Sequence, residues 1–160
     1  MGRGSKFNIY LPALKTQKVP EQVKIDKLLR GTESILFVDD EEALVQVNIQ
    51  LLEKLGYRVT GNTNSHEALS AFKEFPDRFD LVISDQTMPG MTGVELAKKL
   101  MEIRQDIPII LITGYSDVIN RKKAKEMGIR ELVMKPILAS DLSRTIRNAI
   151  DNHNGDGSDG

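Results

Sequence analysis

The chain of 160 residues contains no cysteine and only two histidines, His66 and His153. Without cysteine, disulfide bonds, thiolate metal sites and cysteine nucleophiles are excluded. With so few histidines, we expect neither a histidine-based metal site nor a compact Ser-His-Asp triad.

Long apolar runs and a strong net charge are also missing. The longest apolar run, IPIILI at 107–112, has the length of a strand and is far shorter than a membrane span. The N-terminus lacks the apolar core of a signal peptide. A net charge of −1 gives no argument for binding nucleic acid or an acidic lipid surface. We therefore expect a cytoplasmic chain. We expect it not to bind nucleic acid, and we expect this fragment not to contact a membrane.

Five short apolar runs alternate with five segments of helical periodicity. The predicted strands are 34–38, 57–61, 80–84, 108–113 and 129–134. The predicted helices are 41–56, 65–75, 92–103, 116–128 and 140–150. Such alternation is typical of an α/β fold, in which a doubly wound parallel sheet is covered by helices on both faces.

The two ends of the chain have a different texture. Residues 1–14 and a linker, 15–33, lack sustained periodicity. The last ten residues, 151–160, are polar and rich in glycine, which predicts a disordered tail. One globular domain is therefore expected over 34–150.

Charged and hydroxyl residues stand at the carboxyl ends of four of the predicted strands. They are Asp39 and Asp40, Asp85, Thr113, and Lys135. Parallel strands bring their carboxyl ends to one edge of the sheet, which is where such folds place their sites. One acidic residue after a strand is most often a turn residue or a helix cap, but four strand ends together argue against that explanation.

Three carboxylates at one edge require cations. Two of them 4 Å apart repel by roughly 4 kcal/mol at an effective dielectric of 20. Lys135 supplies one positive charge, and a divalent metal with oxygen ligands, Mg²⁺ or Mn²⁺, would supply the rest. A carboxylate held beside these cations can attack phosphorus, because they neutralise charge on the transferring group. The pattern therefore predicts that one of these carboxylates is a nucleophile toward phosphorus.

Four motifs, FVDDEE, LVISDQTMPGMTGVEL, PIILITGYS and VMKP, occur in an order and spacing that resemble the receiver domain of two-component response regulators. The resemblance covers 34–150. It implies a flavodoxin-like fold with a five-stranded parallel sheet in the order 2-1-3-4-5 and five flanking helices. It also implies a cis peptide bond between Lys135 and Pro136.

The resemblance assigns roles to individual residues. Asp85 would be the phosphoacceptor, and Lys135 and Thr113 would hold the phosphoryl oxygens. Mg²⁺ would be bound by Asp85 together with Asp39, Asp40 and the backbone carbonyl of Thr87. Thr113 would also be the switch hydroxyl.

The chain departs from the receiver pattern at one switch position. Three residues before the lysine, the family often has a tyrosine or phenylalanine that rotates on activation, and this chain has Leu132. A readout through an aromatic rotamer is therefore not expected. Tyr115 and Thr87 occupy positions that tune hydrolysis of the aspartyl phosphate in the family.

The expected function is that of a switch in a phosphorelay. A histidine kinase or histidine phosphotransfer protein would present phosphohistidine, and the receiver would catalyse both its own phosphorylation and its own dephosphorylation. The output would be a protein contact on the face made by the helix at 116–128, the strand at 129–134 and the helix at 140–150.

The N-terminal stretch GRGSKFNIYLP resembles the last glycine-rich box and final strand of the ATP-binding domain of histidine kinases. Residues 1–14 would then be a remnant of that domain. The parent would be a hybrid sensor histidine kinase, which could be anchored in a membrane. The alternative is that the first few residues are vector-derived.

Three other functions fit the sequence less well. A phosphatase of the haloacid dehalogenase type needs Asp-x-Asp on its first strand, whereas Asp85 lies after the third and is followed by Thr87. A dinucleotide site needs a glycine-rich loop where Asp39 and Asp40 stand. A receiver-like interaction module that works without phosphorylation stays open as the alternative.

Overall fold

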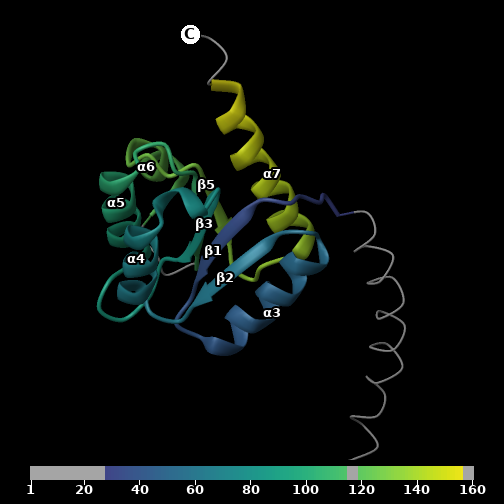
Figure 1. Ribbon diagram of the computed structural model, residues 1–160, viewed down its shortest axis with the longest axis horizontal. Coiled ribbons are helices and arrows are strands. Elements are labelled where there is room, and N and C mark those ends of the chain that lie inside the picture. The colour runs from purple at the N-terminus through teal and green to yellow at the C-terminus, as the bar shows by residue number, and fades with distance from the viewer. Residues whose placement is uncertain (1–27, 115–118, 157–160) are drawn as a thin grey trace, which may run out of the picture.

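The computed structural model describes residues 28–114 and 119–156, with side chains placed as far as residue 152. Its centre is a five-stranded parallel sheet in the order β2-β1-β3-β4-β5 (Figure 1). The strands are β1 Ser34–Val38, β2 Arg58–Asn62, β3 Leu81–Asp85, β4 Ile109–Thr113 and β5 Glu131–Met134. The predicted fold class and strand order are confirmed.

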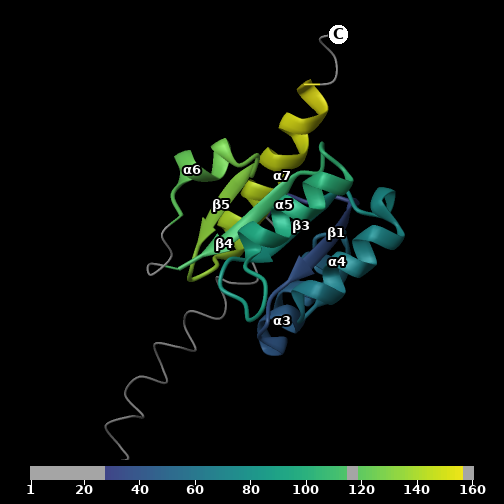
Figure 2. The same cartoon turned by 90° about the vertical axis from the view of Figure 1, so that its left-hand side faces the viewer.

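Helices cover both faces of the sheet (Figure 2). They are α3 Glu42–Lys54, α4 Ser65–Glu74, α5 Gly93–Ile103, α6 Arg121–Glu126 and α7 Ala139–Asp156, with a 3₁₀ turn, η1, at Pro76–Arg78. Helices α3 and α7 lie on one face, and α4, α5 and α6 lie on the other. The capping box predicted at the start of α5 is present, because the side chains of Thr92 and Glu95 each accept from the other residue's backbone N–H.

The sheet separates two apolar clusters. Side chains alternate between the faces of a strand, so neighbouring residues of β1 enter different clusters. Leu36 packs with α4 and α5, whereas Ile35 and Phe37 pack with α3 and α7. Every residue of β3 and β4 is buried. This burial on both faces explains why the strands read as continuous apolar runs.

Two helices have bounds that the sequence pattern missed. Helix α6 was predicted over 116–128, but within the described residues it begins only at Arg121. Asn120 caps it, because its side chain accepts from the backbone N–H of Lys123 at 2.9 Å. Gly128, with φ +87°, follows its end.

The predicted disordered tail begins too early. Helix α7 continues to Asp156, six residues into the segment expected to lack structure. Ala149 and Ile150 are still buried at the predicted end of the domain. The next residue, Asp151, forms an ion pair of 2.7 Å with Arg147 one turn earlier, which favours continuation of the helix.

The described end of the predicted linker, 28–33, packs on the domain. Glu33 receives two hydrogen bonds of 2.9 Å from Nη1 of Arg147 on α7. The backbone N–H of Gly31 donates to the carbonyl of Leu55 at 3.1 Å. A Cβ at Gly31 would lie 2.3 Å from both the Glu33 carboxylate and the Tyr57 ring. This segment is therefore part of the folded unit, while residues 1–14 and the rest of the linker lie outside the described residues.

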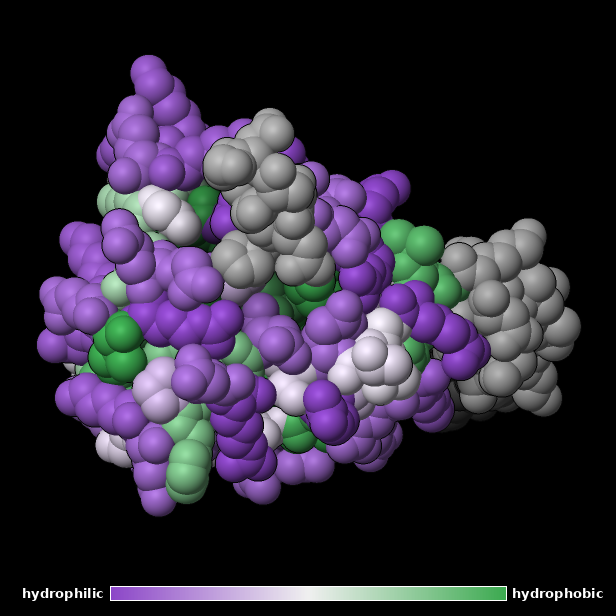
Figure 3. Space-filling view, turned by 45° about the horizontal axis from the view of Figure 1, so that its top comes forward, coloured by the Kyte–Doolittle hydropathy of each residue, from purple (hydrophilic) through white to green (hydrophobic). Residues whose placement is uncertain are grey.

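The face shown in Figure 3 is mostly hydrophilic. Among the described residues, the exposed large apolar side chains are spread along the chain: Leu29, Val47, Phe75, Ile103, Met134 and Leu138. Among the described helices, none combines the length and the apolar character needed to cross a bilayer.

Candidate functional site: an acidic pocket at the carboxyl edge of the sheet

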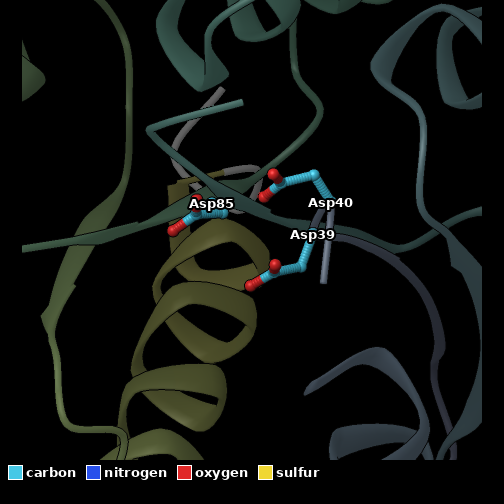
Figure 4. A group of neighbouring side chains, drawn as sticks. All are labelled: Asp39, Asp40 and Asp85. Atoms are coloured by element: carbon cyan, nitrogen blue, oxygen red, sulfur yellow. The ribbon is translucent and has the colours of Figure 1, made fainter. Parts of the chain in front are cut away.

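Strands β1 and β3 bring three carboxylates together. Val38, the last residue of β1, pairs with Ser84, so Asp39 follows β1 directly beside Asp85. The strand prediction ended at 84, and the structure shows Asp85 as the last residue of β3 itself. One carboxylate oxygen from each of Asp39, Asp40 and Asp85 lies within 4.8 Å of the other two, and Figure 4 shows the three side chains as neighbours.

Asp39 is the most constrained of the three. It is fully buried, and its Oδ1 accepts from the backbone N–H of Glu41 at 2.9 Å. Its Oδ2 is also buried and has no hydrogen-bond partner in the described part of the chain. Burial, and to a smaller extent the negative charge of Asp85, raise the pKa of Asp39. The pocket therefore holds an anion whose charge is only partly compensated.

Lys135 provides the nearest positive charge. It follows β5, and its backbone N–H donates to the carbonyl of Thr113 at 2.8 Å. Its Nζ lies 2.8 Å from Oδ1 of Asp85, which is almost fully buried. Partial burial opposes ionisation of the lysine, but the hydrogen bond and charge of Asp85 outweigh it and raise the pKa of Lys135. The peptide bond between Lys135 and Pro136 is cis, as the resemblance implies.

The loop between β3 and α5 is fixed by Gln86 and Gly93. The Gln86 side chain accepts from the backbone N–H of Val94 at 3.0 Å, and its carbonyl accepts from Gly93 at 3.0 Å. A Cβ at Gly93 would lie only 2.4 Å from the backbone oxygen of Asp85. Thr87 is exposed in this loop. The sequence prediction missed Gln86 and Gly93, although a glycine directly after a helix N-cap suggests a close approach of backbone.

Thr113 reaches the same edge from β4. It is buried, and its hydroxyl donates to Sδ of Met134 at 3.0 Å. Leu132, at the position where the family often has an aromatic residue, is buried in the cluster under α4, α5 and α6. Tyr115 lies outside the described residues. Met134 was not among the predicted site residues, although its place as the last residue of β5, next to Lys135, could have suggested it.

The residues present fit a divalent cation. Three carboxylates offer oxygen ligands from one small pocket, and oxygen donors suit Mg²⁺ and Mn²⁺. The unpartnered buried oxygen of Asp39 is the kind of atom that a bound cation would satisfy. Lys135 alone cannot balance three negative charges.

Comparison with known proteins agrees with this arrangement. The family model for the response regulator receiver domain matches residues 35–147. The C4-dicarboxylate transport transcriptional regulatory protein DctD of Rhizobium meliloti is 34% identical over 72% of this chain and 25% of its own length. The sensor kinase CckA of Brucella abortus is 28% identical over 94% of this chain. The chain spans only 17% of that kinase.

Solved structures show the same fold. A receiver domain protein from Clostridium thermocellum superposes with a TM-score of 0.73 at 34% identity, covering 76% of this chain and 97% of that one. A CheY-like receiver domain protein from Methanospirillum hungatei gives a TM-score of 0.71 at 31% identity, covering 79% of this chain and all of that one. Fold, acidic pocket and family match lead to one conclusion: this chain belongs to the response regulator receiver domain family.

Proposed function

We propose that Asp85 accepts a phosphoryl group from phosphohistidine and that this modification switches the domain between two states. The observation that carries the proposal is the ion pair between Lys135 and Asp85, at 2.8 Å, inside a pocket with two further carboxylates. A buried carboxylate in that setting has no evident structural purpose, since three neighbouring anions destabilise the fold that contains them.

In the transfer step, a carboxylate oxygen of Asp85 attacks phosphorus in line with the bond to the histidine nitrogen. An O–P bond forms as the N–P bond breaks, and the electron pair returns to the imidazole. Lys135 stays close to the acceptor and offsets the charge of the incoming group. Thr113, from the neighbouring strand, can turn its hydroxyl toward a phosphoryl oxygen.

We assign Asp39, Asp40, Asp85 and the carbonyl of Thr87 as the residues that would hold Mg²⁺, with Mn²⁺ as a substitute. The bound cation would neutralise charge on the transferring phosphoryl group. Asp39 suits this role because one of its oxygens is already held by the backbone of Glu41 and the other is unpartnered. Thr87 and Tyr115 are proposed to tune the lifetime of the aspartyl phosphate.

Receiver domains interact with histidine kinases or phosphotransfer proteins and with downstream effectors. For this chain we place the effector contact on α6, β5 and α7. Five basic residues lie on or beside this face: Arg121, Lys122, Lys123, Lys125 and Arg130. They favour an acidic partner surface.

The parent protein is proposed to be a hybrid sensor histidine kinase. The alignment with the sensor kinase covers 94% of this chain, which is more than the receiver family match at 35–147. The stretch GRGSKFNIYLP, which resembles part of a kinase ATP-binding domain, supports the same origin.

The test is phosphorylation with acetyl phosphate and Mg²⁺, followed by intact-mass analysis. We expect the wild-type chain to gain one phosphoryl group, and both EDTA and Asp85→Asn to prevent it. Asp77→Asn, at an exposed carboxylate in η1, is the matched control and should be labelled like the wild type. If the wild-type chain gains nothing, or Asp85→Asn is labelled equally, the domain works as a phosphorylation-independent interaction module instead.

A further inference from the structure

The hydrogen bond between Thr113 and Met134 is set by the register of the sheet. Thr113 pairs with Met134 where β4 meets β5, and the two residues end their strands. Partners in register project their side chains from the same face of a sheet. The Thr113 hydroxyl donates to the methionine sulfur at 3.0 Å, and the Thr113 carbonyl accepts from Lys135 at 2.8 Å. Backbone pairing thus holds the sulfur next to the hydroxyl.

This contact competes with the proposed switch. A threonine hydroxyl has one proton, so it donates one hydrogen bond at a time. Thr113 cannot donate to a phosphoryl oxygen on Asp85 while it donates to Met134. Because Thr113 is only 1% exposed, water does not readily replace the sulfur as acceptor. The contact with Met134 therefore favours the state without a phosphoryl group.

Leu132 and Met134 differ in how freely their side chains can move when the Thr113 hydroxyl turns toward a phosphoryl group. Leu132 is buried in the apolar cluster, and its side chain has no atom that can hydrogen-bond to the Thr113 hydroxyl. Met134 is 47% exposed on the edge strand β5, and its unbranched thioether is flexible. Release of Thr113 would therefore free a side chain on the surface of β5 without repacking the core.

We propose that Met134 is a positioning residue that holds the Thr113 hydroxyl away from Asp85 in the resting state, and so lowers the affinity of the pocket for a phosphoryl group. The inference rests on the proposed function, because it concerns the equilibrium on which phosphorylation of Asp85 acts. A contact that exists only in the resting state shifts the population toward that state.

Met134→Leu tests this idea, because leucine keeps the volume of methionine but cannot accept a hydrogen bond. The probe is beryllofluoride with Mg²⁺, a mimic of the phosphoryl group, and its affinity is measured by calorimetry. Removing one net hydrogen bond from the resting state should tighten binding by about two- to tenfold. Met134→Gln restores an acceptor of similar reach and should return the affinity to within about twofold of wild type.

Met127→Leu is the matched control, since this methionine caps α6 and lies outside the pocket. It should bind the probe like the wild type. A second readout is the methyl NMR signal of Thr113 in the protein without probe, which should move in Met134→Leu and stay in place in Met127→Leu. A purely structural role for Met134 would instead lower the stability to urea and leave the probe affinity unchanged.

The outcomes separate the two proposals. If wild type binds the probe but Met134→Leu binds it no tighter, or if the Thr113 signal does not move, the role of Met134 is refuted and the proposed function stands. If the wild-type chain does not bind the probe at all, the proposed function fails and the inference about Met134 fails with it.

Discussion

Replacing Asp39 by asparagine should make the metal-free protein more stable while removing its response to Mg²⁺. The substitution keeps the shape of the side chain and the oxygen that accepts from Glu41, but it removes one negative charge from the cluster. Two unit charges at the 4.8 Å limit of this cluster repel by about 3.5 kcal/mol at an effective dielectric of 20. Lost attraction to Lys135 offsets part of that relief, so we expect a gain of about 1 to 3 kcal/mol in the free energy of unfolding.

The gain should depend on pH in a defined direction. The pKa of Asp39 is raised above its ordinary value of 3.8, chiefly by burial, so the native state takes up this proton more readily than the unfolded state does. Ionisation of Asp39 therefore lowers the free energy of unfolding as pH rises from 3.8 through the native pKa, and this loss persists at neutral pH. The stabilisation by Asp39→Asn should be complete at pH 7 and should disappear below pH 3.8.

Urea unfolding, with EDTA or with Mg²⁺, measures both effects. In EDTA at pH 7, Asp39→Asn should unfold at a higher urea concentration than wild type. The slope of the free energy of unfolding against urea concentration should be unchanged. Added Mg²⁺ should stabilise the wild type through binding to the native state, and should stabilise the variant much less. Asp77→Asn should differ from wild type by less than about 0.5 kcal/mol in both solutions. A destabilised variant in EDTA, or an undiminished response to Mg²⁺, would refute the reasoning.

Two further predictions concern Gly93 and Glu33. Gly93→Ala should destabilise the protein by about 2 kcal/mol or more, because the new methyl group would lie 2.4 Å from the backbone oxygen of Asp85. Gly61→Ala should cost less in the same urea titration, because the three atoms nearest to its new methyl group belong to the side chains of Val45 and Ile49. Equal losses would contradict this. Glu33→Gln should cost about 1 kcal/mol at pH 7. Burial acts to raise the pKa of Glu33, but the hydrogen bond from Arg147, together with bonds to the backbone, outweighs it, so this pKa is lowered. The difference from wild type should therefore be complete above pH 4.5 and vanish as pH falls through the lowered native pKa, and a pH-independent difference would contradict it.

Much of the pocket could be predicted from sequence because its determinants are local. Apolar runs such as 80–84 identify buried strands, and parallel strands end at one edge. Two carboxylates that each follow such a run are therefore expected to lie close together. This rule alone places Asp39 and Asp85 at the same edge of the sheet, where the structure has them.

Features that depend on specific side-chain hydrogen bonds could not be predicted in the same way. Helix α6 starts where Asn120 supplies a cap, yet several polar residues before it could serve equally well. The continuation of α7 past residue 150 includes the ion pair of Arg147 and Asp151, which a composition typical of disorder does not reveal. The bond from Thr113 to Met134 needs the register of β4 and β5, which no periodicity reveals.

The contacts of residues 28–33 with α7 limit where this domain can be truncated. The family match runs from 35 to 147, so a recombinant domain trimmed to those limits would lose Glu33 at one end and Asp151 at the other. Arg147 would then keep neither of its two carboxylate partners. Sequence similarity marks what relatives share, whereas the packed and hydrogen-bonded part of this chain extends a few residues further on each side. A recombinant domain that retains Gly31 and Glu33 at one end and Asp151 at the other keeps these contacts.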